Sequence, residues 1–478
     1  MIEISSILVL AITIYFVSKP SKKISKTITS NKFYLKGAIK YFIYNLNRSV
    51  IGIGGAGSGK TYSLIKPLLV YCIKNRGCLT FDPKGELTPL INQHAKESNK
   101  EIINFSLDNN YDKINPLSLC QDKTDIIEFS SYFLSGIVGI PKSDTAKYFF
   151  NAAKSILIGV IIFFKNKNKN FATIPHIVAL FLTVNSKELI SLLSSDEEAK
   201  RASMILSTVK DDPKLLGSII STFTAYFGSL DTPKIFRNLV SNEPLNLPNN
   251  PSNPCVINLI FNLQKRDLYT PIYSSIVGLI IKKMNIPHQH ESAIIIDEFT
   301  VLSIPNFVNI PETARSNKIA TCIAIQDLSQ LISRYGKEDA SSIISNMGSQ
   351  FLFRTTNPET LDHFEKMLGR RDIKSISKNI PDFSLHSSVT HGVKEKNILK
   401  KEQIINYKPG QVFGIISEGN KTLIENERIN GNHYLKKTNT KPLMETDTNS
   451  RIAYDQVYRD INSLIIRDTS IKTKKFNI

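Results

Sequence analysis

The sequence predicts an α/β protein built on a doubly wound, mainly parallel sheet. Short β-branched runs recur along the chain, segments with helical spacing of apolar residues separate them, and polar residues stand where several of the runs end. The chain has 478 residues, of which 41% are hydrophobic, and five scattered cysteines. It can therefore bury a sizeable core, which excludes disordered chains and small disulfide-stapled scaffolds.

The first element is a mostly apolar run at residues 4–18, followed by eight Lys and Arg and no Asp or Glu in residues 19–50. As a helix this run is shorter than the roughly 30 Å hydrocarbon core, but flanking lysines can extend its reach. A secretory signal carries its positive charge before the apolar run, and here the order is reversed. We expect a retained membrane anchor with nearly all of the chain on the cytoplasmic side. The alternative is a buried or interfacial helix.

A strand at 50–53 is followed by a phosphate-binding loop and then by an apolar segment of helical spacing at 64–70. The loop consists of Gly54, Gly55, Ala56, Gly57, Ser58, Gly59, Lys60 and Thr61. Its spacing is G-x-x-x-x-G-K-T, in which backbone N–H groups surround a phosphate. We expect Lys60 to contact the β and γ phosphates of ATP and Thr61 to hold Mg²⁺. Pro67 is expected to kink or end the helix.

A second buried strand at 292–296 ends in Asp297 and Glu298. Open α/β sheets place their ligands at the carboxyl ends of the strands. We expect Asp297 to hold Mg²⁺ through water and Glu298 to polarise the attacking water. Together with the phosphate loop, this pair predicts ATP hydrolysis.

A third strand, at 319–325, ends in Gln326. A polar side chain at this position can sense the γ-phosphate, so Gln326 is a candidate catalytic residue. The alternative is an exposed glutamine at the end of a strand. A further strand near 350–353 continues the doubly wound pattern.

Several segments resemble the type IV coupling proteins of conjugation and type IV secretion, the TraG/TraD-like branch of hexameric RecA-like ATPases. They include the phosphate loop, the D-P-K-G-E turn at 82–86, the N-P-L element at 115–117, the Asp297 pair and the block from Gln326 to Leu331. The resemblance covers roughly residues 50–435. It implies a RecA-like P-loop core with an inserted all-α domain, in addition to the short N-terminal membrane helix.

The resemblance, together with the composition of the two ends, predicts a division of the chain. The expected parts are the anchor and its basic flank (1–27), the first part of the nucleotide-binding domain (28–124), the inserted all-α domain (125–245), the second part of the nucleotide-binding domain (246–435) and a polar C-terminal tail (436–478). The apolar run at 156–164 is too short to span a membrane and is expected to be a buried helix. Family members often carry two membrane helices, whereas we identify one candidate.

The implied function is that of a membrane-anchored ATPase of the bacterial inner membrane. It would couple ATP hydrolysis to the recruitment and translocation of DNA, or of a relaxase–DNA complex, into a type IV secretion or conjugation channel. It would act as a homo-oligomer, expected to be a hexamer, in which Arg315 of one subunit completes the site of the next. Arg354 is a second candidate for that arginine. Its partners would be the DNA cargo, the channel components and the membrane.

The alternative is a receptor that delivers protein effectors to the channel without pumping DNA. Charge does not decide between the two, although the net charge of the whole chain is +18. Residues 51–364 carry 31 basic and 28 acidic side chains and are nearly neutral. The expectation of DNA as cargo therefore depends on the resemblance alone.

Overall fold

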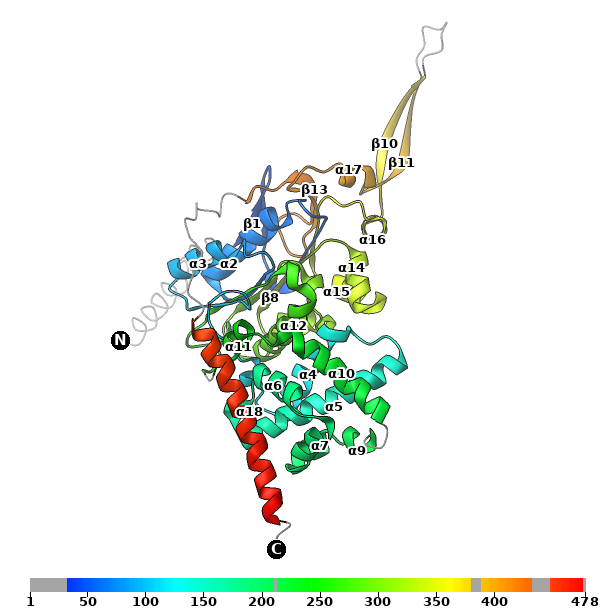
Figure 1. The fold of residues 1–478 in the computed structure, drawn as a ribbon. Helices are drawn as coiled ribbons and strands as arrows, with labels where there is room; N and C mark the ends of the chain where they lie inside the picture. Colours follow the sequence, from blue (N-terminus) through cyan, green and yellow to red (C-terminus); the bar gives the residue numbers. More distant parts are fainter. Residues whose placement is uncertain (1–31, 210–212, 242, 380–387, 432–447, 476–478) are drawn as a thin grey trace, which may run out of the picture.

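The structure is a computed structural model, and it describes residues 32–209, 213–241, 243–379, 388–431 and 448–475. The expected membrane anchor at 4–18 lies outside these residues. The described chain has a sheet-containing part and a helical part, with one hairpin projecting from the sheet-containing part (Figure 1).

A nine-stranded sheet forms the core of the first part. Its strands are β3 (Val50–Ile53), β4 (Gly77–Asp82), β5 (Ile102–Phe105), β6 (Val256–Ile260), β7 (Ser292–Ile296), β8 (Ile319–Ile325), β9 (Ser349–Leu352), β12 (Gln411–Ile415) and β13 (Leu423–Arg428). They lie in the order β13-β12-β9-β3-β8-β7-β4-β6-β5, and all neighbours from β9 to β5 are parallel. β12 and β13 add an antiparallel hairpin at one edge. The predicted α/β class with a mainly parallel sheet is confirmed.

Both faces of the sheet are buried, because its central strands consist almost entirely of apolar residues. All seven residues of β8 are buried: Cys322 and Ala324 pack on one face, and Ile323 and Ile325 on the other. The first face is covered by α2 (Lys66–Asn75), α3 (Thr88–Glu97) and the small hairpin of β1 (Phe33–Lys36) and β2 (Lys40–Ile43). The second face is covered by α12 (Arg266–Met284).

Helices occupy the chain between β5 and β6. They are α4 (Lys123–Val138), α5 (Asp144–Lys167), α6 (Ile174–Thr183), α7 (Ser186–Ser194), α8 (Glu197–Ala202), α9 (Ile205–Val209), α10 (Pro213–Leu230) and α11 (Pro233–Leu239). Of the described helices, α5 alone is long and apolar enough to cross a membrane. Its stretch from Ile156 to Phe164 is nevertheless buried inside the helical part, as predicted. α4 packs against α12, which joins the helical part to the sheet.

The remaining helices of the sheet-containing part follow its later strands. They are α13 (Ile310–Ser316), α14 (Leu328–Tyr335), α15 (Lys337–Ser345), α16 (Pro358–Leu368) and α17 (Lys401–Ile405). The projecting hairpin consists of β10 (Arg370–Asn379) and β11 (Ser388–Asn397), which pair antiparallel along ten residues each.

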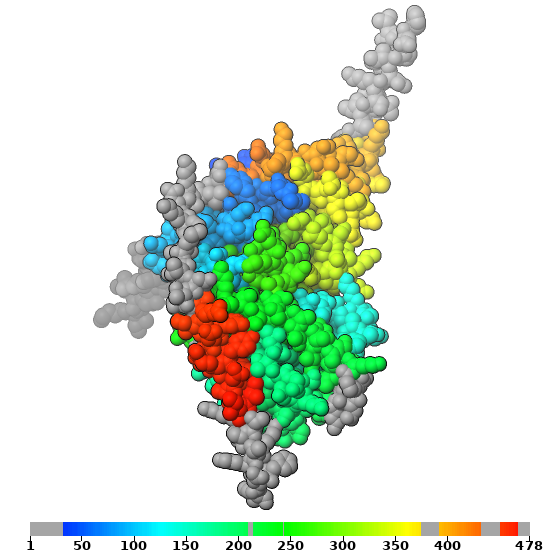
Figure 2. Space-filling view, viewed as in Figure 1, coloured from blue at the N-terminus to red at the C-terminus, as the bar shows by residue number. Residues whose placement is uncertain are grey.

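The C-terminal segment, expected as a polar tail, contains the helix α18 (Thr448–Lys475). It lies along the helical part against α6 and α11, as Figures 1 and 2 show. The rings of Tyr454 and Tyr458 stack near Phe236, with centroids 5.0 and 6.2 Å away, and the Tyr458 hydroxyl donates to Asp231 over 2.8 Å. Val457 and Ile461 are buried on the same face as these tyrosines, at spacings of three and four residues. An apolar stripe therefore holds α18 against the helical part.

Candidate nucleotide site

Three neighbouring parallel strands bring the predicted site residues to one edge of the sheet. β8 lies between β3 and β7, and the register pairs Ile53 with Ile325 and Ile296 with Ile323. The phosphate loop after β3, Gln326 after β8 and the carboxylate pair after β7 therefore emerge side by side. This carboxyl edge is where parallel sheets of this type bind ligands.

Close packing explains two of the loop's glycines. A Cβ atom at Gly54 would come within 2.7 Å of the Phe353 Cβ atom. Gly59 has φ +94, and a Cβ atom there would come within 2.4 Å of the Gly410 backbone nitrogen. The Gly410 N–H in turn donates to the Ser58 carbonyl over 2.9 Å. The turn at Gly410, more than 300 residues later in the chain, thus packs directly against the phosphate loop.

Lys60 is 8% exposed, and its ammonium group donates to the carbonyls of Gly54 and Gly55. Burial lowers the pKa of Lys60, whereas the nearby carboxylates of Glu298 and Asp297 act in the opposite direction. The lysine therefore lies inside the loop, near enough to the two acidic side chains for their charges to counteract the effect of burial on its pKa.

The helix that follows the loop does not end at Pro67. A π-helical turn, Thr61–Ile65, leads directly into α2, and the Lys66 N–H donates to the Thr61 carbonyl five residues earlier. Pro67 directly follows this π-helical turn, where the regular four-residue hydrogen-bond ladder is already interrupted, so its missing N–H is tolerated. Of the two expectations for Pro67, a kink or an end of the helix, the end is wrong, because the helical segment continues to Asn75.

Thr61 and Asp297 meet across the strands. The Thr61 hydroxyl donates to Asp297 Oδ2 over 2.9 Å. Burial raises the pKa of Asp297 to about 6, although the bond from Thr61 opposes this shift. A hydroxyl and a carboxylate side by side are oxygen ligands that Mg²⁺ prefers, so these residues fit the predicted metal.

Glu298 belongs to a closed set of four side chains, which we call the Glu298 network: Glu298, Thr300, Gln326 and Gln330. Gln326 Nε2 donates to Glu298 Oε2 over 3.1 Å, and Gln330 Nε2 donates to Gln326 Oε1 over 3.3 Å. The Thr300 hydroxyl lies 3.2 Å from both Glu298 Oε1 and Gln330 Oε1, and donates to one of them at a time. Both carboxylate oxygens of Glu298 thus have partners.

The backbone of Glu298 is in the left-handed region, with φ 67 and ψ 60. This conformation costs free energy for a residue with a side chain and is concentrated at functional sites. Sequence reasoning identified Glu298 and Gln326, but gave no role to Thr300 or Gln330. Thr300 lies two residues after Glu298 and Gln330 four after Gln326, yet only the fold brings all four together.

The two candidate arginines lie at opposite edges of the sheet. Arg315 is exposed at the end of α13, before β8 begins, and its charge acts on Glu418. Arg354 is also exposed, but it follows β9, and its carbonyl accepts a hydrogen bond of 2.8 Å from the Gly55 N–H. Arg354 is therefore next to the phosphate loop of its own chain, and Arg315 is not.

The D-P-K-G-E turn at 82–86 has a structural basis. The buried Asp82 carboxylate accepts hydrogen bonds of 2.9 Å from the backbone of Leu87 and Thr88 and one of 3.0 Å from the Thr88 hydroxyl, which fixes the start of α3. Burial raises the pKa of Asp82, and these bonds counteract the rise. The turn thereby places Lys84 close enough to lower the pKa of Lys60, so two cations lie near the phosphate loop.

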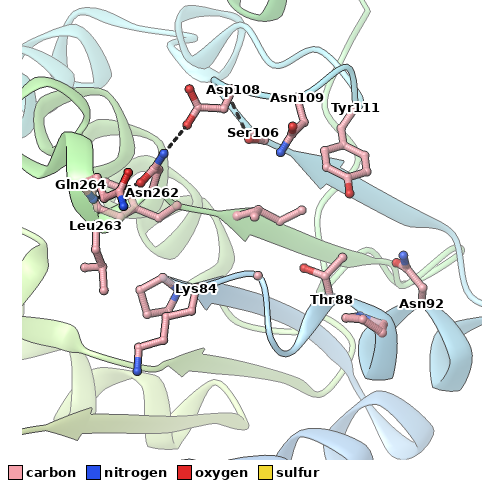
Figure 3. Close-up of a pocket in the computed structure, with 15 residues that line it drawn as sticks. Lys84, Thr88, Asn92, Ser106, Asp108, Asn109, Tyr111, Asn262, Leu263 and Gln264 are labelled. Atoms are coloured by element: carbon pink, nitrogen blue, oxygen red, sulfur yellow. Dashed lines mark hydrogen bonds between the residues drawn. The ribbon is translucent and has the colours of Figure 1, made fainter. Parts of the chain in front are cut away.

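A cavity of about 650 Å³ lies beside this turn at the ends of β4, β5 and β6. Its lining combines apolar residues with uncharged polar ones, among them Asn92, Asn109, Asn262 and Gln264 (Figure 3). Lys84 extends away from Asp108 and Asn109 in this view. Asp108 is already bonded to Lys265 over 2.5 Å and to the Tyr269 hydroxyl over 2.8 Å. Lys265, which follows β6, therefore forms an ion pair at the rim of this cavity.

This fold and this site define the class of P-loop nucleoside triphosphatases. Residues 15–423 match the family described as "Type IV secretory system Conjugative DNA transfer", and the chain therefore belongs to that family. The resemblance inferred from the motifs is confirmed. Comparison with curated protein sequences gave no match.

Among solved structures, the chain is similar to the bacterial conjugative coupling protein TrwBdeltaN70 in its unbound monoclinic form. The TM-score is 0.60 at 13% identity, over 82% of this chain and 87% of that one. The plasmid coupling protein TrwB in complex with ADP and Mg²⁺ gives a TM-score of 0.58 at 14% identity, over 79% and 84%. TrwB with a non-hydrolysable ATP analogue gives 0.55 at 14% identity, over 79% and 84%. At these identities the likeness establishes the fold, a RecA-type core.

Proposed function

We propose that this protein is a membrane-anchored ATPase that couples ATP hydrolysis to the recruitment and translocation of DNA, or of a relaxase–DNA complex, into a type IV secretion or conjugation channel. Family membership supports the process, and the nucleotide-bound forms of the similar TrwB structures support ATP and Mg²⁺ as ligands. The observation that carries the proposal is the meeting of Thr61 with Asp297 and of Gln326 with Glu298 at the carboxyl edge of the sheet.

Each side chain has a separate task in this proposal. Lys60 moves from the loop carbonyls to the phosphates of ATP. Thr61 and Asp297 hold Mg²⁺, which when bound neutralises negative charge on the phosphates. Glu298 orients and polarises the attacking water, because it is a carboxylate that follows β7 at the same edge of the sheet as the phosphate loop. Gln326 positions Glu298 and responds to the γ-phosphate.

The ATPase proposal is tested by steady-state release of phosphate from ATP, using the full chain in detergent. Lys60→Ala is expected to abolish ATP binding and turnover. Lys74→Ala is the matched control, because Lys74 is an exposed lysine on the helix that follows the same loop. Equal turnover by the wild type and Lys60→Ala would refute hydrolysis at this site.

We propose a homo-oligomer, a hexamer, in which Arg315 acts on the nucleotide of the neighbouring subunit. Arg315 is at the edge of the sheet opposite its own phosphate loop, so any contact with phosphates requires a second subunit. An arginine supplied between subunits stabilises the charge that develops during phosphoryl transfer.

We propose the bacterial inner membrane as the location, with the bulk of the chain in the cytoplasm. The apolar run at 4–18 and the lysines that follow it are the basis for this assignment. The test is alkaline extraction of membranes that contain either the full chain or a chain lacking residues 1–27. The full chain is expected to stay in the membrane pellet and the shortened chain to be released; equal partitioning of the two would contradict the anchor.

A further inference from the structure

A second polar cavity, of about 980 Å³, adjoins the catalytic carboxylate. Glu298, Gln326 and Gln330 line one part of it, and three basic side chains line another. We call it the arginine cavity. Its basic residues are Lys142 from the connection of α4 and α5, Arg266 at the start of α12 and Arg334 from α14.

The two arginines converge on a single oxygen atom. Arg266 Nη2 donates to the Thr300 carbonyl over 2.9 Å, and Arg334 Nε donates to the same carbonyl over 3.2 Å. Lys142 Nζ donates to the Ser333 carbonyl over 2.9 Å. Each guanidinium has five N–H donors, so these bonds use a small part of their capacity.

No carboxylate forms an ion pair with these three side chains among the salt bridges of the described residues. Burial and the neighbouring charge of Arg266 lower the pKa of Arg334, whereas Asp267 acts on it in the opposite direction. Arg266 and Arg334 are partly buried cations that share one neutral acceptor, so they repel each other. An anion bound between them would offset this repulsion by attracting both.

We propose that the arginine cavity binds a phosphate group between Arg266 and Arg334, with Lys142 at its rim. Guanidinium groups bind phosphate oxygens through paired N–H donors, and here two of them approach from different helices. The phosphate group has two possible sources: inorganic phosphate released at the neighbouring site, or a phosphodiester of the DNA cargo.

Thr300 connects this cavity to catalysis. Its carbonyl is held by the two arginines and its hydroxyl contacts Glu298. A phosphate that draws the arginines from the carbonyl changes the position of Thr300, and with it the Glu298 network. Occupancy of the cavity therefore alters the rate of hydrolysis. This second part rests on the proposed ATPase function, whereas phosphate binding does not.

The binding test uses the full chain in detergent without nucleotide. Inorganic phosphate is titrated into the wild type and into the double variant Arg266→Gln/Arg334→Gln, and the heat of binding is measured. Glutamine keeps an N–H donor for the Thr300 carbonyl while removing the charge, so the fold is retained. Arg451→Gln, an exposed arginine on α18, is the matched control. Sulfate is expected to compete with phosphate, and chloride is not.

A parallel titration measures the binding of a fluorescent single-stranded oligonucleotide as a function of salt concentration. If inorganic phosphate is the source, the double variant weakens phosphate binding at least tenfold and leaves DNA binding unchanged. If the DNA backbone is the source, the double variant weakens DNA binding and lowers the salt dependence by about one unit of slope per lost contact. The binding proposal is overturned if the double variant matches the wild type in both titrations, including the case in which the wild type binds neither probe.

The connection to Glu298 is tested with Thr300→Val, which removes the hydroxyl and keeps the backbone carbonyl. The variant is expected to bind the same probe within twofold of the wild type, while the effect of that probe on ATP turnover is lost. If the probe still changes the ATP turnover of Thr300→Val, Thr300 does not connect the arginine cavity to Glu298. If the wild type binds the probe but hydrolyses no ATP, the proposed function fails and the phosphate site stands.

Discussion

Gln326 donates a hydrogen bond from Nε2 to Oε2 of Glu298 over 3.1 Å, although the two residues follow different strands and are 28 positions apart. The contact exists because β7 and β8 are neighbours in the sheet, and β8 also lies beside the phosphate-loop strand β3. Gln326 is thereby in a position to hold the carboxylate and to respond to events at the phosphate loop.

Glu298→Gln is expected to bind ATP within about threefold of the wild type and to slow turnover by about 10²–10⁴-fold, the usual contribution of a positioned general base. The amide keeps the shape of the carboxylate but cannot accept a proton from water. The measurement is equilibrium binding of a labelled ATP analogue together with steady-state hydrolysis. Glu312→Gln, an exposed glutamate on α13, serves as the control. If Glu298→Gln turns over ATP within threefold of the wild type, Glu298 is not the general base.

Gln326→Glu is expected to move the rising limb of the pH–rate profile to higher pH by about one unit or more, because two adjacent carboxylates raise the pKa of one of them. The profile of turnover between pH 5 and 9 measures this shift. The matched control is Gln403→Glu, at an exposed position of α17, which should give the wild-type profile. Superimposable profiles of Gln326→Glu and the wild type would contradict the contact with Glu298.

Asp297→Asn is expected to stabilise the nucleotide-free and metal-free protein at pH 7.5 by roughly 1–3 kcal/mol while abolishing Mg²⁺ binding. The pKa of Asp297 rises from 3.8 to about 6 on folding, so the ionised carboxylate opposes folding above pH 6. The gain from the amide is therefore largest above pH 6 and disappears as the pH falls toward 4.

The free energy of unfolding of Asp297→Asn is measured by chemical denaturation at pH 7.5, 6 and 4.5. Asp339→Asn, at an exposed position of α15, is the control. A gain that is independent of pH, or an Asn variant less stable than the wild type at pH 7.5, would show that burial does not raise the pKa of Asp297.

Mixtures of Lys60→Ala and Arg315→Ala subunits are expected to recover part of the ATP turnover that each variant lacks alone. A mixed oligomer contains interfaces at which an intact phosphate loop meets an intact Arg315. The measurement is turnover as a function of the mixing ratio after the subunits have exchanged. Arg315→Ala alone should still bind nucleotide. If Arg315→Ala turns over ATP at the wild-type rate, Arg315 is not the arginine that acts on the neighbouring subunit's nucleotide. The exposed Arg354 would then be tested in the same way.

Local patterns predicted the parts of the structure that local physics determines. The strands at 50–53 and 319–325 are found with those bounds, because a buried parallel strand requires a continuous apolar run. The spacing of the phosphate loop predicted the strand, loop and helix around Lys60. The site of Asp297 and Glu298 was predicted from their position directly after an apolar strand.

Other features depend on contacts between distant segments. The contact of Thr300 with Gln330 arises only when β7 and β8 lie side by side. The arginine cavity combines residues separated by more than 100 positions, and each of its basic side chains is unremarkable in its local sequence. The apolar residues of α18 do recur at helical spacing, but the sequence does not identify Phe236, more than 200 positions earlier, as the partner of Tyr454 and Tyr458.

We propose that ATP hydrolysis at this site drives the handling of DNA. It is tested most directly by ATP turnover of the full chain in detergent, with and without single-stranded or duplex DNA, and with Lys60→Ala as the control. DNA is expected to stimulate turnover severalfold, and Lys60→Ala is expected to show no turnover under either condition. ATP hydrolysis that requires Lys60 but is indifferent to both forms of DNA would contradict DNA translocation and favour a receptor that delivers protein effectors.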